Sequence, residues 1–487
     1  LWSGDAKDGV ECQISDFKAG DAVLPATVAQ ARFVRYTLAD PQLYKFKKGR
    51  EPVLAPDMLD SLSRFDMPAR SVRPVWVTID VPQDAETGVY KAEVTVKHNG
   101  WGKVTLPLVL DVVNHVLAEP AEWDYHLDLW QHPTSVARAH GLKVWSDEHF
   151  EALKPVMTRL AEAGQKVITA TLNKDPWNHQ CYDAYEDMIK WTLKKDGTWS
   201  YDYKVFDRVV ETMMGLGINK MINCYSMVPW NCELHYFDEA KGEQVTVKAE
   251  PGTPIFPEIW TPFLLDFKKH LEAKGWLAFT NIAMDERSPE AMDAAVKVLE
   301  KCAPEMGFAL ADNHKSYKKY TMMRDVCVAQ GQPADHADIV ARRQQGFNTT
   351  FYVCCGPAFP NTFTHSQPYE PELLGWYNLA CDYDGMLRWA YNSWPENPEM
   401  DSRFGGWTSG DTYLVYPHNR SSIRFERLID GIETFNSADL YPLAIERAKK
   451  YGFFMVGATD AHGSIARDYL LEHPIRNLTM IFAKLSY

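Results

Sequence analysis

The stretch WLAFTNIAMDERSPEAMDAAVKVLEKC, residues 276–302, contains the unit on which the predicted fold depends. Its first part is an apolar run of a length suited to one buried strand, and Asp285 and Glu286 follow that run directly. Ser288 and Pro289 then supply a favourable N-cap and first position for a helix with apolar residues at helical spacing. A strand, a polar turn and a capped helix in this order are typical of α/β proteins.

The same alternation of strand and helix recurs on both sides of this unit. Strands are predicted at residues 125–131, 166–173, 218–227, 276–283, 308–313, 326–329, 348–355 and 385–392. Helices are predicted at residues 147–163, 204–215, 259–275, 288–302, 337–345 and 371–379. A polar stretch at residues 233–253 interrupts the pattern and is predicted to form a hairpin. Eight strands that alternate with helices favour the α/β class and a closed (β/α)8 barrel of the TIM type over an open sheet.

The first part of the chain has the two-residue periodicity of strands with one buried face. Apolar residues alternate with polar residues in runs around residues 75–81, 90–96 and 106–112. We therefore predict three parts: a β-sandwich over residues 1–118, the barrel over residues 119–430 and an atypical C-terminal tail over residues 431–487.

Composition excludes several classes of partner. The chain has 51 Lys and Arg against 65 Asp and Glu, a formal net charge of −14, and no basic run, so nucleic acid is not an expected partner. No apolar stretch approaches the ~18 residues that a membrane span needs. The nine cysteines lack zinc or disulfide spacing, which predicts thiols without a metal. The 16 Trp residues, several of them in polar loops, suit a protein that stacks indole rings on sugars.

Asp285 and Glu286 are the candidate catalytic residues, because active sites of such barrels lie at the carboxyl ends of the strands. Two carboxyl groups that lie close together tend to separate their pKa values, so that one is ionised while the other keeps its proton. Glycoside hydrolysis needs an acid for the leaving oxygen and a negative group for the developing positive charge. Adjacent residues cannot easily straddle an anomeric carbon, which favours assistance by a 2-acetamido group of the substrate. The dipeptide alone also fits a charge pair at a helix N-terminus.

Seven motifs spread along the chain resemble glycoside hydrolase family 123, the retaining β-N-acetylgalactosaminidases, which includes the domain of unknown function 4091. They are LAPDML (54–59), RPVWV (73–77), HLDLWQHP (126–133), MDE (284–286), WAYNSW (389–394), GDTYLVYP (410–417) and SIRFE (422–426). The likeness runs from near residue 30 to about Asp430, and it agrees with the barrel and with the position of the carboxylate pair.

The resemblance implies hydrolysis of terminal β-linked N-acetylgalactosamine from a glycan or a glycolipid-type oligosaccharide, without a cofactor. Asp285 would stabilise the acetamido group and the oxazolinium-type intermediate, and Glu286 would act as acid and then as base. The resemblance also implies a periplasmic or secreted location.

Other candidate substrate contacts follow from the predicted strand ends. Tyr391, and after it Tyr225, are the candidates for a hydrogen bond to the acetamido oxygen. Trp394, past the end of the last strand, is the candidate for stacking on the sugar. The remaining candidates are His132, Asn173, Trp177, Asn392 and Asp411. Each has an ordinary structural alternative, namely core packing for Trp, a loop contact for the polar residues and a turn for Asp411.

The tail beyond Asp430 resembles instead the closing part of a polymerase-and-histidinol-phosphatase phosphoesterase. Asp460 and His462 would correspond to metal ligands of that family, but the early His-x-His motif is absent, so no metal site is expected. The alternative interpretation of this tail is a helix and a strand that pack on the barrel. A gene fusion or a fault in gene assembly would also produce such a junction.

Three functional alternatives remain open at the level of sequence. The first is a β-N-acetylhexosaminidase for another 2-acetamido glycan, since contacts to the 4-hydroxyl are not visible in sequence. The second is a carbohydrate-binding barrel without catalytic activity, which would tolerate Glu286→Gln. The third is a metal-dependent phosphoesterase, which a chelator would inactivate.

Overall fold

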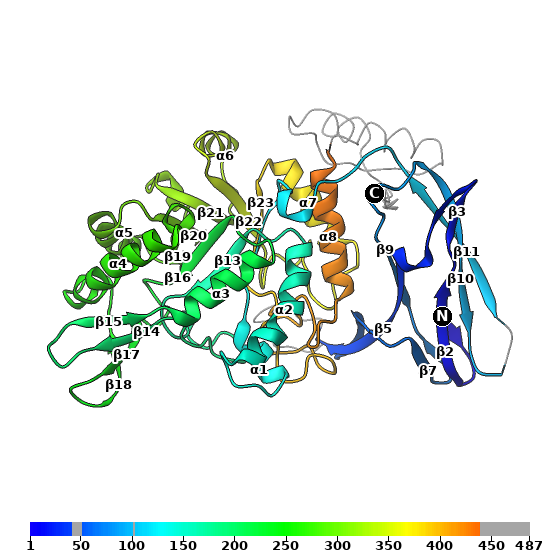
Figure 1. Cartoon of the computed structure of the whole chain (residues 1–487), viewed down its shortest axis with the longest axis horizontal. Coiled ribbons are helices and arrows are strands. Elements are labelled where there is room, and N and C mark those ends of the chain that lie inside the picture. Colours follow the sequence, from blue (N-terminus) through cyan, green and yellow to red (C-terminus); the bar gives the residue numbers. More distant parts are fainter. Residues whose placement is uncertain (41–50, 101–102, 439–487) are drawn as a thin grey trace.

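The computed structural model describes residues 1–40, 51–100 and 103–438, in which a sheet-rich N-terminal part lies beside an α/β barrel (Figure 1). Most of the predicted tail, including Asp460 and His462, lies outside the described residues. Within the described ranges, no helix is long and apolar enough to cross a bilayer.

The N-terminal part consists of two main antiparallel sheets that enclose an apolar core. One sheet contains β4 (Ala22–Leu24), β3 (Phe17–Ala19), β10 (Gly88–Lys97), β2 (Lys7–Ile14) and β7 (Arg64–Met67) in this order, with β11 (Val104–Val112) paired to β10. The other contains β6 (Val53–Leu59), β5 (Ala29–Ala39) and β9 (Val75–Ile79). Phe17, Tyr90 and Leu110 of the first sheet are buried with Ala29 and Ile79 of the second packed against them, which confirms the predicted sandwich.

The eight parallel strands of the second part form one sheet that closes on itself. In spatial order they are β12 (His126–Leu129), β23 (Gly385–Arg388), β22 (Asn348–Tyr352), β21 (Met323–Ala329), β20 (Gly307–Asp312), β19 (Thr280–Asp285), β16 (Met221–Tyr225) and β13 (Val167–Thr171). The outermost strands meet through a parallel bridge between Leu127 and Gln165, where the amide of Lys166 donates to the Leu127 carbonyl at 2.9 Å. The predicted (β/α)8 barrel is therefore confirmed, and each of the eight predicted strands overlaps an observed one.

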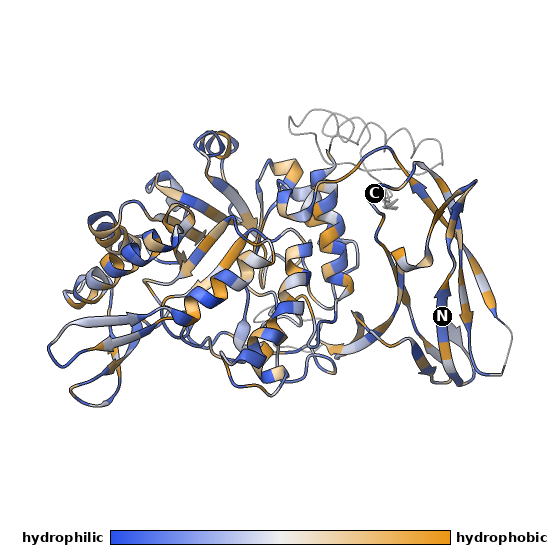
Figure 2. Cartoon of the chain, viewed as in Figure 1, coloured by the Kyte–Doolittle hydropathy of each residue, from blue (hydrophilic) through white to orange (hydrophobic). Residues whose placement is uncertain are grey.

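Helices surround the barrel and bury one face against it. They are α1 (Pro133–Ala139), α2 (Asp147–Glu162), α3 (Lys204–Gly215), α4 (Ile255–Lys274), α5 (Pro289–Cys302), α6 (His336–Arg343), α7 (Glu370–Cys381) and α8 (Ile423–Asn436). Figure 2 shows hydrophilic and hydrophobic residues interleaved along these helices, as expected for helices with one face in water. Ser288 and Ser422 cap α5 and α8, each accepting a hydrogen bond from the third residue along.

The structure departs from the predicted elements in several places, and helices α1 and α8 were not predicted. The polar excursion is larger than one hairpin: β14 (Lys190–Leu193), β15 (Trp199–Asp202), β17 (Glu233–Asp238) and β18 (Glu243–Lys248) form a separate four-stranded sheet. The last barrel strand ends at Arg388, four residues before its predicted end at Asn392. Consequently Tyr391 and Trp394 belong to the loop that follows the strand.

Candidate active site

The carboxylate pair lies where β19 ends. Strand alternation places Asp285 on the same face as Ala283, which is buried inside the barrel. Glu286 then has a left-handed backbone with φ of 45°, and its amide donates to the Ala311 carbonyl of β20 at 2.9 Å. This turn breaks the alternation, so the side chain of Glu286 reaches into the mouth of the barrel instead of pointing away from it.

Glu286 reaches across the mouth to a tyrosine on a distant strand. The hydroxyl of Tyr352, at the end of β22, donates to Glu286 Oε1 at 2.5 Å. Two strands, β20 and β21, lie between β22 and β19. Their residues in the central cluster are small, namely Ala309, Ala311 and Cys327, with Ala329 packed against them. Small side chains here leave the space in which a glutamate and a tyrosine can meet.

Asp285 has different surroundings from Glu286. The indole N–H of Trp230 donates to Asp285 Oδ2 at 3.2 Å, and the Arg287 guanidinium lies 4.8 Å from the centre of the Trp230 ring. Burial, and secondly the negative charge of Glu286, raise the pKa of Asp285 to about 7. Arg287 and the indole groups of Trp230 and Trp177 oppose that rise. Near neutral pH this carboxyl group therefore exchanges readily between its protonated and ionised forms.

Aromatic rings form the wall beside the pair. The ring centres of Trp130, Trp177 and Tyr225 lie 4.7–5.0 Å from one another, and Tyr185 lies 4.7 Å from Trp177. These residues belong to the same buried cluster as Tyr352. Of the residues predicted to contact substrate, the structure thus brings Tyr225 and Trp177 to the carboxylate pair.

Tyr391 and Trp394 lie elsewhere. The Tyr391 hydroxyl donates to the Val156 carbonyl of α2 at 2.9 Å, and its ring packs on Phe425 of α8. The Trp394 indole donates to the Val415 carbonyl at 2.6 Å. Both side chains are buried in the large core between barrel and helices, a different cluster from the one at the mouth. The physical reason is the early end of β23, which changes the direction of the chain before these residues.

The four polar candidates hold the framework of the mouth. His132 and Asn392 join their two loops: the His132 amide donates to the Asn392 side chain at 2.9 Å, and the Asn392 amide group donates to the His132 carbonyl at 3.0 Å. Burial lowers the pKa of His132 to about 4, so it is neutral at physiological pH. Asn173 exchanges two hydrogen bonds with the backbone of His235 in β17.

Asp411 acts on the mouth through its neighbours. It forms a fully buried ion pair with Arg388 at 2.8 Å and accepts a hydrogen bond from the Trp389 indole at 3.3 Å. Trp389 in turn packs against the aromatic cluster at the mouth. The Asp411 amide also donates to the Thr408 carbonyl at 2.9 Å, which closes a turn. Asp411 therefore lies in the turn expected from the sequence and also contacts Arg388 and Trp389.

Sequence reasoning did not identify Tyr352 or Arg287 as site residues. Tyr352 lies inside a predicted strand, and only its position near the strand end could have drawn attention to it. Trp230 follows the third predicted strand and is one of the aromatic residues expected at the barrel mouth, but its contact with Asp285 was not predicted. Arg287 comes directly after the carboxylate pair, and its charge could have identified it as a partner of that pair.

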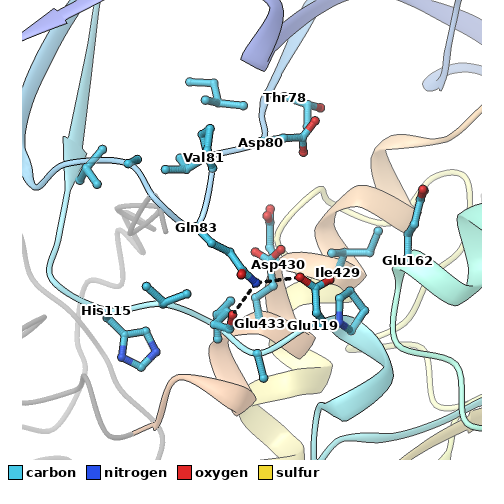
Figure 3. Close-up of a pocket in the computed structure, with 18 of the residues that line it drawn as sticks. Thr78, Asp80, Val81, Gln83, His115, Glu119, Glu162, Ile429, Asp430 and Glu433 are labelled. Atoms are coloured by element: carbon cyan, nitrogen blue, oxygen red, sulfur yellow. Dashed lines mark hydrogen bonds between the residues drawn. The ribbon is translucent and has the colours of Figure 1, made fainter. Parts of the chain in front are cut away.

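A cavity of about 800 Å³ lies between the sandwich and the barrel (Figure 3). The loop after β9, the linker after β11, and helices α2 and α8 line it. Gln83 bridges two points of the linker by donating to the Leu117 carbonyl and to Glu119. Asp285 and Glu286 do not line this cavity, so we place the candidate active site at the barrel mouth.

Within residues 1–40, 51–100 and 103–438, no group of three or more His, Cys, Asp or Glu residues is arranged to hold a metal ion. All nine cysteines lie in these ranges as free thiols, and the Sγ atoms of Cys354 and Cys355 are 3.7 Å apart.

The fold is a (β/α)8 barrel with an N-terminal sandwich, and two family models identify its class as glycoside hydrolase. The family model described as glycoside hydrolase 123, catalytic domain, matches residues 130–440, and the model of the glycoside hydrolase 123 N-terminal domain matches residues 1–98. The chain belongs to glycoside hydrolase family 123.

The chain is also similar to solved structures. A family 123 glycoside hydrolase from Clostridium perfringens, described with the details of glycolipid glycan hydrolysis, is 28% identical with a TM-score of 0.85, covering 92% of this chain and 83% of its own. A Bacteroides ovatus GH5 xyloglucanase matches at 11% identity and a TM-score of 0.30, covering 83% of this chain and 96% of its own, which is too distant to support an argument. No curated protein matches the chain.

Proposed function

We propose that this enzyme removes terminal β-linked N-acetylgalactosamine from a glycan or glycolipid-type oligosaccharide by substrate-assisted retaining hydrolysis. The observation that carries the proposal is the pair of adjacent carboxyl groups at the barrel mouth, held by different partners: Asp285 by an indole and Glu286 by a phenol. Family membership and the glycolipid-directed relative support the choice of substrate class.

The two carboxyl groups divide the chemistry. Asp285 accepts the acetamido N–H, which directs the acetamido oxygen towards the anomeric carbon and stabilises the positive charge of the oxazolinium-type intermediate. Glu286 gives its proton to the leaving oxygen as the glycosidic bond breaks. In the second step water attacks the anomeric carbon and returns a proton to Glu286.

The pKa of Asp285 in the free enzyme determines whether Asp285 is ionised when the substrate binds. Asp285 has a pKa of about 7 in the free enzyme, whereas the proposed role requires its ionised form. An acetamido N–H that donates to Asp285 favours the ionised form. Binding of a 2-acetamido sugar would therefore prepare Asp285 for catalysis, which a plain galactoside could not do.

Hydrolysis of a small set of aryl glycosides tests the proposal. We expect cleavage of the β-N-acetylgalactosaminide, much slower cleavage of the N-acetylglucosaminide, and none of the plain β-galactoside. Cleavage of the galactoside would contradict substrate assistance, because that sugar has no acetamido nucleophile. Preference for the glucosaminide would favour a β-N-acetylhexosaminidase of another specificity.

Glu286→Gln is the matched variant for the carboxylate role, since it keeps size and hydrogen bonding while removing the acid. We expect loss of about 10²–10⁴-fold in kcat/KM, the usual contribution of general acid–base catalysis. Wild-type and variant proteins that bind the sugar equally and cleave nothing would instead identify a carbohydrate-binding barrel.

A further inference from the structure

We propose that Tyr352 is the positioning residue for Glu286: its hydroxyl holds Oε1 and leaves Oε2 as the oxygen that exchanges the proton with the substrate. This inference rests on the proposed function, in which Glu286 is the acid and then the base. The inference adds a residue of another strand to the carboxylate pair. It also gives the two carboxyl oxygens of Glu286 different roles.

The geometry supports this assignment. Glu286 is anchored at both ends: its amide donates to Ala311 of β20, and Oε1 accepts the Tyr352 hydroxyl of β22 at 2.5 Å. In the described part of the chain, no other side chain donates a hydrogen bond to this carboxyl group. A glutamate in a left-handed turn would otherwise have several rotamers available, so the contact with Tyr352 selects one of them.

The room for this contact is built into the two intervening strands. Ala309 and Ala311 of β20, with Cys327 and Ala329 of β21, contribute only small side chains to the centre of the barrel. Larger residues lie further round the barrel, including Tyr225 of β16 and Tyr352 of β22, whereas β19 contributes the small Ala283. The distribution of small and large side chains around the barrel therefore permits a bond between residues that are 66 positions apart.

Tyr352 is suited to remain a donor throughout the cycle. Burial, and secondly the charge of Glu286, raise its pKa well above the ordinary value for tyrosine, so it does not give up its proton. Donation to an ionised carboxylate is stronger than donation to a neutral carboxyl group. Tyr352 therefore stabilises Glu286 after it has protonated the leaving oxygen, while the proton itself moves only between Oε2, the leaving oxygen and water.

Other charged groups face Glu286 and act beside Tyr352. Asp285 and Arg287 are its chain neighbours, with opposite charges. Cys355, which follows β22, also interacts electrostatically with Glu286. These three groups are unchanged when Tyr352 is replaced by Phe, so a change in the leaving-group dependence of that variant reports the loss of the hydroxyl.

The test compares wild type with Tyr352→Phe on aryl β-N-acetylgalactosaminides of graded leaving-group acidity. Poor leaving groups need the acid most, so we expect kcat/KM to fall about 10²-fold for the phenyl glycoside and less than tenfold for the 2,4-dinitrophenyl glycoside. We also expect the loss to fall on kcat, with KM within about twofold of wild type, because Tyr352 contacts Glu286 in the free enzyme.

The leaving-group dependence is a ratio within one variant, and KM does not depend on enzyme concentration, so both readouts are independent of the amount of folded enzyme. Tyr383→Phe is the matched control: Tyr383 is buried, its hydroxyl accepts from the Ala334 amide at 3.0 Å, and we expect neither readout to change. An equal loss of activity for all leaving groups, or a loss confined to KM, would overturn the role of Tyr352.

Glu286→Gln separates failure of this inference from failure of the proposed function. In Glu286→Gln, kcat/KM should also fall more for poor leaving groups than for good ones. If Glu286→Gln shows this dependence and Tyr352→Phe does not, the positioning role alone is overturned. Absence of the dependence in Glu286→Gln would show that Glu286 is not the acid and would overturn both.

Discussion

At the scale of single residues, the two neighbouring carboxyl groups differ because the chain turns between them. Asp285 completes the strand and accepts a hydrogen bond from the exposed Trp230 indole, whereas Glu286 bends across the mouth to Tyr352. Adjacent residues therefore acquire separate partners without the distance between strands that an ordinary retaining pair uses. From this difference we make two predictions, one about Trp230 and one about Asp285.

Trp230→Phe should move the acidic limb of the activity profile. The indole N–H favours the ionised form of Asp285, so its loss raises the pKa of Asp285 above about 7. Since the ionised form is the active one, we expect the acidic limb of kcat/KM to move up by roughly half to one pH unit. Trp199→Phe, in the sheet beside the barrel, should leave the limb in place. An unmoved limb in Trp230→Phe would mean that the indole does not act on Asp285.

Asp285→Asn should stabilise the fold at high pH while abolishing activity. The pKa of Asp285 is raised by folding, so stability is lost as pH rises from the unfolded value of 3.8 through about 7. Asparagine does not ionise, and after allowing for solvent screening we expect a gain on the order of 1–2 kcal/mol at pH 8 and little at pH 4. Denaturant unfolding at the two pH values measures it; equal stability of the two proteins at pH 8 would contradict it.

At the scale of elements, the ends of strands decide which residues reach the mouth. β23 ends at Arg388, and the loop beyond it is fastened to the start of α1 by Asn392. That loop carries Tyr391 and Trp394 into the core beside α2 and α8. The strand was predicted correctly, but its last few residues determine which side chains are available to a substrate.

Asn392→Ala tests whether this residue serves the loop or the ligand. The buried His132 amide would lose its partner and the His132 carbonyl would keep only the Ser135 hydroxyl, so we expect a loss of about 1–3 kcal/mol in the free energy of unfolding. We expect KM to stay within about twofold under conditions where the variant is folded. A large rise in KM with unchanged stability would instead support the direct substrate contact inferred from the sequence.

At the scale of the whole molecule, the sandwich and the barrel share buried polar contacts. Asp57 of β6 pairs with Arg424 of α8 at 2.9 Å and accepts the Tyr416 hydroxyl at 2.7 Å, with both charged side chains almost completely buried. Arg32 of β5 pairs with Glu426 in the same way at 2.9 Å. The sandwich therefore supplies the opposite charges for two buried residues of the barrel, Arg424 and Glu426.

Asp57→Ala should destabilise the protein strongly. It leaves Arg424 buried without its carboxylate, a change that typically costs about 3–5 kcal/mol. Arg35→Ala is the control, because Arg35 is partly exposed and its pair with Asp60 should contribute less than about 1 kcal/mol. Thermal unfolding of the three proteins checks this; equal midpoints for Asp57→Ala and wild type would show that the two parts are stable independently of this contact.

The sequence by itself determined the barrel, the sandwich and the location of the carboxylate pair. These features depend on periodicity, caps and the position of residues after an apolar run, all of which are local in the chain. The eight predicted strands and the pair Asp285 and Glu286 at the end of the fourth belong to this group.

Only the tertiary structure decided which side chains meet at the mouth. Tyr352 contacts Glu286 because two strands of small residues lie between them, which no local pattern in the chain specifies. Tyr391 turns away because its strand ends early, and a change of a few residues at a strand end redirects every side chain that follows. Local sequence fixes the elements, whereas packing between elements fixes the contacts of the site.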